Sequence, residues 1–134
     1  MNRLLIGVFL LTAVVTACNQ QTVVSKNDAL GSARGFIESS LKGNFETAQQ
    51  YLMPDSSNLQ YFEGYKEFYS QRSDSEKEGY KNADIIIDST QNLSDSVRVI
   101  TFSNTFKNKP SKLKMVKKGT DWLVDFKYTF QNDQ

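Results

Sequence analysis

The chain has 134 residues, of which 39% are hydrophobic, and its formal net charge is +1. This length allows one domain, and the charge balance does not indicate nucleic-acid binding. The chain contains no histidine and one cysteine, Cys18, which excludes serine–histidine and cysteine–histidine catalytic pairs, histidine-containing zinc sites and an internal disulfide. No cofactor or metal is expected, because the glycines are scattered and form no phosphate-binding loop.

The first residues have the layout of a signal peptide. Arg3 supplies one positive charge, and an uncharged apolar run follows over residues 4–15. As a helix, the 14 residues 4–17 would span about 21 Å, which is shorter than a hydrocarbon core of about 30 Å. We therefore expect residues 1–17 to be a removed leader. The remaining 117 residues then carry no net side-chain charge, because all 15 acidic side chains and all basic ones except Arg3 lie beyond the leader.

Small residues directly precede the cysteine, in the order Val15-Thr16-Ala17-Cys18. This segment resembles the lipobox of bacterial lipoproteins, in which the cysteine becomes the first mature residue and carries lipid. A thiolate is a strong nucleophile, and the two or three acyl chains of such a residue make a lasting membrane anchor at about 0.8 kcal/mol per buried methylene. The alternative is an ordinary signal peptide followed by an incidental cysteine or a buried free thiol.

The residues after Cys18 predict a location. By similarity to enterobacterial lipoproteins, Asn19 rather than Asp at this position favours the outer membrane. Residues 19–26 contain no acidic side chain and so differ from acidic surface-export tags, which favours a periplasm-facing position. Because the segment is polar and has no clear helical periodicity, we expect residues 18–27 to be a lipidated tether.

Helical spacing begins after the tether. Asn27 or Asp28 can cap a first helix that ends near Gly43, and its apolar positions are Leu30, Ala33, Phe36, Ile37 and Leu41. Gly31 and Gly35 fall on one face of this helix. They indicate either close packing against another element or simply a helix of modest propensity, because each glycine costs about 1 kcal/mol relative to alanine.

Two further helices are predicted. Asn44 can cap a short helix that runs to Leu52 and ends before Pro54. Residues 55–57 can cap a third helix, from about Ser57 to Gln71. The polar stretch 70–79 is expected to be a helix end and a loop.

From residue 80 the pattern changes to strands. Short β-rich or alternating runs are found at residues 83–90, 97–107, 113–116 and 122–130, and turn residues separate them. The predicted fold class is α+β, with three N-terminal helices packed on a four-stranded antiparallel sheet in a single domain, residues 28–134. In the last strand, alternation places Trp122, Val124 and Phe126 on the buried face and Asp125 on the face toward water.

One string carries a family resemblance. Leu41-Lys42-Gly43-Asn44-Phe45-Glu46-Thr47-Ala48 joins two predicted helices, and Gly119-Thr120-Asp121-Trp122 opens the last strand. Over about residues 28–130 the chain resembles the nuclear-transport-factor-2-like superfamily, and within it small bacterial lipoproteins sometimes labelled lumazine-binding-like. The resemblance implies a cone-shaped α+β domain. Its motifs specify a fold more than an activity.

A cone of this kind can enclose an apolar ligand. The residues expected nearest such a cavity are Phe36, Tyr51, Tyr61, Tyr65, Phe102, Trp122, Phe126 and Tyr128. The alternative is that these aromatic side chains fill an ordinary core, because a domain of this size needs large side chains to bury enough area.

The enzymes of the superfamily, such as ketosteroid isomerases and polyketide cyclases, place an acidic base or an Asp–His pair inside the cone. This chain has no histidine, and its acidic candidates are Glu63, Asp88 and Asp125. A desolvated carboxylate inside the cone would favour catalysis, and solvent-facing ones would argue against it. No enzyme activity is predicted.

Six lysines lie within twelve positions, at 107, 109, 112, 114, 117 and 118. They predict either attraction to an anionic membrane, at up to about 1 kcal/mol each, or protection of an exposed strand edge against pairing with other chains.

Together these patterns predict a lipid-anchored, non-catalytic protein of the bacterial cell envelope. Its expected partners are the membrane, through lipid on Cys18, and an unknown small ligand or envelope protein bound by the sheet face or the cavity. A small isomerase- or cyclase-type enzyme is the alternative. A third possibility is a spacer or assembly module, which a large exposed apolar patch would indicate.

Overall fold

The computed structural model describes residues 24–131. Their elements, in chain order, are α1 Ala29–Leu41, α2 Phe45–Gln49, α3 Ser56–Ser70, α4 Asp74–Lys81, β1 Ile85–Ser94, β2 Val97–Asn104, β3 Ser111–Lys118, β4 Asp121–Asp125 and α5 Lys127–Gln131. The expected leader, residues 1–17, the expected lipidation site, Cys18, and the start of the expected tether lie outside the described residues. Between residues 24 and 131, no helix combines the length and the apolar character needed to cross a membrane.

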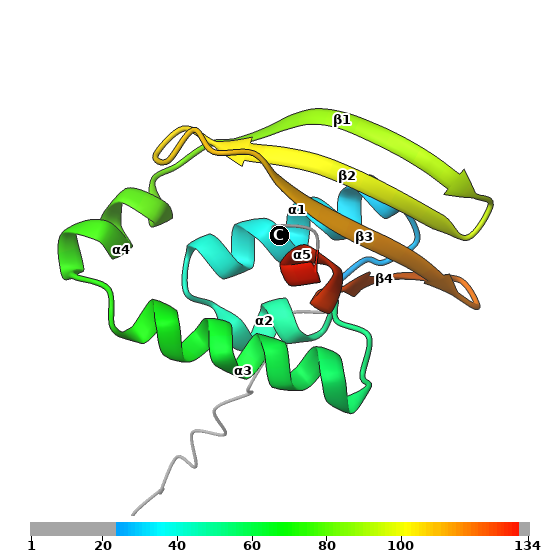
Figure 1. The fold of residues 1–134 in the computed structure, drawn as a ribbon, viewed down its shortest axis with the longest axis horizontal. Helices are drawn as coiled ribbons and strands as arrows, with labels where there is room; N and C mark the ends of the chain where they lie inside the picture. Colours follow the sequence, from blue (N-terminus) through cyan, green and yellow to red (C-terminus); the bar gives the residue numbers. More distant parts are fainter. Residues whose placement is uncertain (1–23, 132–134) are drawn as a thin grey trace, which may run out of the picture.

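The four strands form one antiparallel sheet in the order β1-β2-β3-β4, and the helices lie on one side of it (Figure 1). The predicted α+β class and the antiparallel meander are therefore confirmed. The number of helices is not three, because five helices occur within the described part of the chain.

The first three helices begin at capping side chains that the sequence predicted. At α1, Asp28 Oδ2 accepts the Gly31 N–H at 2.7 Å, so Asp28 rather than Asn27 is the cap. Gly43 follows α1 with φ +72°, the left-handed conformation that favours glycine after a helix. Asn44 and Asp55 cap α2 and α3 in the same way as Asp28 caps α1.

The second helix is shorter than predicted, because the chain after it joins the sheet. Helix α2 ends at Gln49 instead of Leu52. The Val124 N–H donates to the Tyr51 carbonyl at 2.8 Å, and the Met53 N–H donates to the Val124 carbonyl at 3.0 Å. Leu52 is thereby bridged in parallel to the free side of β4.

Helix α4 occupies a stretch that was predicted to be a loop. Ser73 caps it by accepting the Glu76 N–H at 3.2 Å. The spacing of serine and glutamate is a known helix-start pattern. Apolar periodicity does not reveal this helix, because α4 has no buried residue and so no apolar stripe.

Helix α5 replaces the second half of the predicted last strand. Phe126 and Phe130 have the even spacing of a strand face, but they also lie one helical turn apart. The Lys127 N–H donates to Asn58 Oδ1 of α3 at 2.9 Å, so the chain leaves the sheet after Asp125.

The first two strands also differ from their predicted bounds. Strand β1 continues to Ser94, so only two residues connect it to β2. Strand β2 ends at Asn104 rather than residue 107, because the Asn104 side chain accepts the N–H groups of Phe106 and Lys107 at 3.1 and 3.0 Å and turns the chain.

The core lies between the sheet and helices α1 and α3. Its largest fully buried apolar side chains are Phe62, Ile100, Leu113, Met115 and Val124. The rings of Phe36, Phe62 and Phe126 meet pairwise with centres 5.4–5.8 Å apart. Among the described residues, the buried members of this cluster all lie within residues 29–126, so we expect the chain from residue 19 onward to fold on its own.

Candidate ligand pocket

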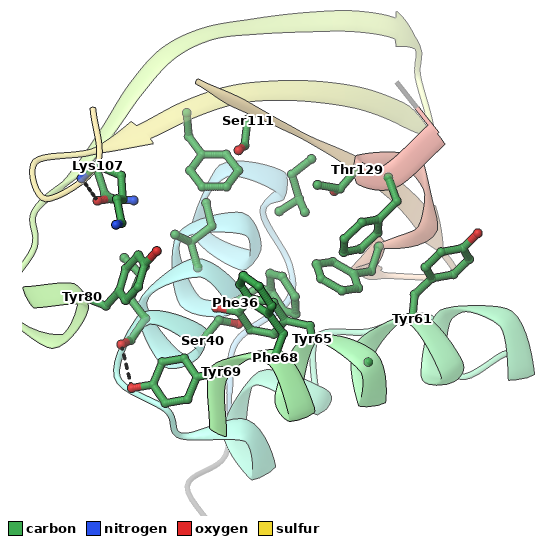
Figure 2. A pocket seen from close by; sticks show the side chains of 18 of the residues that line it. Phe36, Ser40, Tyr61, Tyr65, Phe68, Tyr69, Tyr80, Lys107, Ser111 and Thr129 are labelled. Carbon is green, nitrogen blue, oxygen red and sulfur yellow. Dashed lines mark hydrogen bonds between the residues drawn. The ribbon is translucent and has the colours of Figure 1, made fainter. Parts of the chain in front are cut away.

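A pocket of about 1040 Å³ lies between the helices and the sheet (Figure 2). Helices α1 and α3 form one side, β2 and β3 the other, and α4 and α5 close its two ends. Its walls are rich in aromatic side chains, namely Phe36, Tyr61, Tyr65, Phe68, Tyr69, Tyr80, Phe102, Phe126 and Phe130. Tyr61, Phe68 and Phe130 are also among the exposed large apolar side chains of the protein, so apolar surface is present where the pocket meets solvent.

Five of the eight residues predicted to lie near a cavity line this pocket, namely Phe36, Tyr61, Tyr65, Phe102 and Phe126. They come from α1, α3, β2 and the end of β4, which the core packing brings together. Phe36 and Phe126 are buried core members, Tyr65 and Phe102 pack against the core, and Tyr61 is exposed, so the same aromatic side chains contribute to both the core and the pocket wall.

The other three predicted residues lie elsewhere. Tyr51 is buried against α1, where a Cβ at Gly35 would overlap its ring and hydroxyl, so the close packing expected of that glycine is present. The Arg98 guanidinium lies 4.7 Å from the centre of the Trp122 ring. Tyr128 belongs to α5 rather than to a strand, and Lys114 Nζ lies 5.6 Å from its ring centre.

The hydroxyl of Tyr65 stays protonated. Burial, together with the neighbouring tyrosines Tyr80 and Tyr69, raises the pKa of Tyr65 to about 12. Burial also raises the pKa of Tyr69, whose hydroxyl lies 3.5 Å from the Leu41 carbonyl. At neutral pH these groups are therefore hydrogen-bond donors and not anions.

Cations gather at the α4 end of the pocket. Arg72, Lys107 and Lys109 line it there. Glu76 pairs with Arg72 at 3.1 Å and with Lys107 at 3.7 Å. Burial opposes ionisation of Glu76, but hydrogen bonding at Ser73 and these two cations hold its pKa below the ordinary value. The ionised Glu76 carboxylate thus pairs with two of the three cations, Arg72 and Lys107.

Two buried polar atoms in the pocket wall lack partners. Ser40 is 6% exposed, and its Oγ makes no hydrogen bond within the described residues. Arg72 Nε is likewise buried without a partner there, although its Nη1 bonds Glu76. An unsatisfied buried polar group costs about 1–3 kcal/mol, so these two atoms lower the stability of the pocket wall.

The acidic candidates do not lie in the pocket. Asp88 is exposed on β1, and the Glu63 side chain is 64% exposed and pairs with Lys66 at 2.8 Å. No aspartate or glutamate is among the residues that line the pocket. Nor do the residues between 24 and 131 bring three acidic or cysteine side chains into a group that could hold a metal.

The expectation that Asp125 points to water is wrong. This residue is 6% exposed, and its carboxylate accepts from Lys127 Nζ at 2.8 Å and Asn58 Nδ2 at 3.1 Å. Lys114 Nζ lies 3.4 Å away. Burial raises the pKa of Asp125, but the hydrogen bonds from Lys127 and Asn58 and the charge of Lys114 outweigh it, so the net shift is downward. Asp125 therefore has a structural role at the junction of α3, β4 and α5.

The lysine-rich segment does not guard a strand edge. Strand β3 lies between β2 and β4, so the four lysines at 112, 114, 117 and 118 are on an interior strand. They have separate environments, since Lys114 pairs with Asp125 and Lys117 Nζ lies 6.0 Å from the Trp122 ring centre. Only Lys107 and Lys109, in the loop before β3, reach the pocket.

Sequence patterns missed the α4 side of the pocket. The sequence predicts Arg72 in a helix end or loop and Tyr80 at the start of the strand region, and neither prediction brings them near Phe36. The serine–glutamate spacing at Ser73 and Glu76 is the one pattern that could have located them, because it predicts the helix that ends near Tyr80.

Comparison with known proteins gives no match to this chain among protein-family models, curated proteins or solved structures.

Proposed function

We propose that this protein binds a small apolar ligand in the pocket between its helices and sheet, and that it does so without catalysis. The observation that carries the proposal is an aromatic pocket of about 1040 Å³ with no acidic lining residue. Pockets for small organic ligands have volumes of about 300–1,000 Å³ and are mostly apolar with a few polar groups. This pocket matches that description.

The proposal includes the setting of the protein. Cys18 carries lipid, residues 1–17 are its leader, and the protein faces the periplasm at the outer membrane of a bacterium. The lipobox-like segment and Asn19 support this placement. The domain is a cone of the nuclear-transport-factor-2-like type, which is supported by helices gathered on one side of an antiparallel sheet with a pocket between the two layers.

The geometry favours binding over isomerase or cyclase chemistry. A cone-type enzyme would need an acidic base within reach of a substrate in the pocket. Glu63 and Asp88 are exposed, and Asp125 is held by two lysines and an asparagine outside the pocket. The pocket instead offers tyrosine hydroxyls and cations beside a wall of rings, which suits recognition of a ligand.

Gly64 allows the pocket to be filled without disturbing the core. It lines the pocket, and a Cβ built there meets no heavy atom within 4 Å. We expect Gly64→Phe to abolish binding of the neutral apolar dye Nile red, followed by its fluorescence. The melting temperature of the variant should not fall, because phenylalanine has a better helix propensity than glycine.

Two controls separate blockage from other effects. Gly64→Ala adds one carbon and should keep the affinity for Nile red. Ser70→Phe places the same ring on an exposed site of α3 that does not line the pocket, and it should also keep the affinity. If the wild-type protein does not bind the dye, or if Gly64→Phe binds it as tightly as Gly64→Ala, the pocket is not the binding site.

A further inference from the structure

We infer that the ligand is an anionic amphiphile, an acyl chain with a carboxylate or phosphate head, whose head binds to Arg72, Lys107 and Lys109. The inference rests on the proposed function, because it specifies the chemistry of the ligand for the same pocket.

The α4 end of the pocket carries an excess of positive charge. Glu76 is shared between Arg72 and Lys107. Lys109 is exposed and makes no hydrogen bond or ion pair within residues 24–131. The three cations therefore exceed their one carboxylate. Because the whole chain has a net charge of only +1, attraction for an anion is a local property of this end.

The Arg72 guanidinium at this end is the second observation. The Arg72 side chain is 26% exposed and lines the pocket, and its Nη1 bonds Glu76. The guanidinium carbon lies 3.8 Å from the centre of the Phe68 ring, which fixes its plane beside the pocket. Because guanidinium groups bind carboxylates and phosphates through several donors in one plane, Arg72 suits an oxyanion at this end of the pocket.

The aromatic wall of the pocket extends away from the cations toward the opposite end. Figure 2 shows Lys107 and Tyr80 at one end of the pocket and Tyr61 and Thr129 at the other, with Phe36, Tyr65 and Phe68 between them. The far end is apolar, since the Tyr61 and Phe130 rings stack there at 5.3 Å. An amphiphile with its head at the cations would lay its chain along these rings.

Titration calorimetry on the chain from residue 19 to 134 tests the inference with four ligands that share a ten-carbon chain. They are decanoate, decyl phosphate, decanol and decyltrimethylammonium, each used below its micelle concentration. We expect at least one of the anions to bind about fivefold more tightly than decanol, because its head group can pair with more than one cation and each partly exposed pair contributes only weakly. Decyltrimethylammonium should bind most weakly. Preference for the carboxylate indicates a fatty acid as the source, and preference for the phosphate indicates a phospholipid-derived head.

A charge-removal pair places the head group. Lys107→Gln combined with Lys109→Gln should reduce the preference for anions over decanol, measured as the ratio of their affinities in the same variant, to about twofold or less. Lys117→Gln combined with Lys118→Gln removes the same charge from exposed sites on β3 outside the pocket and should leave the preference intact.

The outcomes distinguish the two proposals. Equal affinity for decanol and both anions, or tightest binding of the ammonium ligand, overturns the anionic head and leaves the apolar pocket standing. An anion preference that survives loss of Lys107 and Lys109 overturns the placement of the head. Failure of all four ligands to bind overturns the proposed function itself.

Discussion

At the scale of single residues, the buried carboxylate of Asp125 joins three elements. It receives hydrogen bonds from Asn58 of α3 and Lys127 of α5, and it pairs with Lys114 of β3. A charge is tolerated at such a position only when it is paired and hydrogen-bonded. This cluster therefore fixes where the chain leaves the sheet and where the α5 wall of the pocket begins.

We predict that Asp125→Asn reduces the free energy of unfolding at pH 7 by about 1–3 kcal/mol, the usual loss for a hydrogen bond to a charged group. The pKa of Asp125 lies below its unfolded value of about 3.9, so its stabilisation is present above that pH and is lost as pH falls through the lower folded value. In urea unfolding at pH 7, 5 and 3, the free energy of unfolding should fall less between pH 7 and pH 3 in Asp125→Asn than in the wild type.

Asp121→Asn is the matched control. Asp121 pairs with Lys26 at 3.3 Å, but its side chain is 44% exposed, and such pairs contribute about 1 kcal/mol or less. Asp121→Asn should therefore follow the wild-type pH profile. If Asp125→Asn loses as much stability on acidification as the wild type, the carboxylate is not the acid-sensitive group.

Residues that act locally were predictable from the sequence, and residues that act across the fold were not. Asp28, Asn44 and Asp55 each accept a hydrogen bond from the backbone N–H three residues later, so a short sequence pattern identifies them as caps. The direction of Asp125 was wrong because its partner Asn58 lies 67 positions away. Strand alternation describes only the strand and does not include a helix that approaches its end.

At the scale of elements, α4 is the part of the pocket with the weakest support. No residue of α4 is buried, and its main packing contact is the edge-to-face pair of Tyr80 and Phe106 at 5.0 Å. Helical stability normally comes from a buried face, so α4 depends on its cap at Ser73 and on charge pairs such as Arg72–Glu76.

We predict that Ser73→Ala accelerates hydrogen exchange of the α4 amides about fivefold, because loss of an N-cap costs about 1 kcal/mol. Amides in α1 should exchange as in the wild type, since α1 is anchored by its own buried face. Mass spectrometry of peptic fragments separates the two helices.

Ser75→Ala provides the comparison for this measurement. Ser75 is exposed inside α4 and caps nothing, so alanine there should not accelerate exchange. Equal acceleration in both variants would mean that α4 responds to any loss of a hydroxyl and not to the cap.

The sequence predicted the type of an element, helix or strand, where its apolar residues followed a single helical or strand spacing. The α1 and α3 helices and the sheet followed from their apolar spacing, whereas two features depended on contacts that no local pattern contains. Helix α2 stops early because residues 51–53 bond to β4, and α5 forms because Asn58 captures the Lys127 N–H. In both cases the competing partner lies far away along the chain.

At the scale of the whole molecule, the described fold begins close to β4. The Trp122 N–H donates to the Lys26 carbonyl at 2.7 Å, and Val24 packs against the core. Residues 19–23 separate Val24 from Cys18, and an extended chain spans at most about 3.6 Å per residue. If Cys18 is lipidated, the domain is therefore held within roughly 20 Å of the membrane surface.

We predict that Cys18→Ser leaves an unprocessed precursor or a soluble protein, because no lipid can be attached to a hydroxyl in place of the thiol. Fractionation of cells into soluble, inner-membrane and outer-membrane material measures this. Asn19→Asp serves as the partner variant, and it should remain lipidated but move to the inner membrane. Membrane fractionation of Cys18→Ser like that of the wild type would contradict the anchor.

The backbone bonds along β4 have a consequence for self-association. Residues 51–53 and Lys26 occupy the outer side of β4, so β1 is the edge of the described sheet that no other strand covers. An open edge is a template for joining sheets between copies, and anchored copies would meet often on a membrane. Two register shifts, between Ile87 and Ser89 and between Asn92 and Ser94, interrupt the regular ladder of β1. A second sheet would find no continuous row of matching groups there, which opposes fibre growth between copies of the protein.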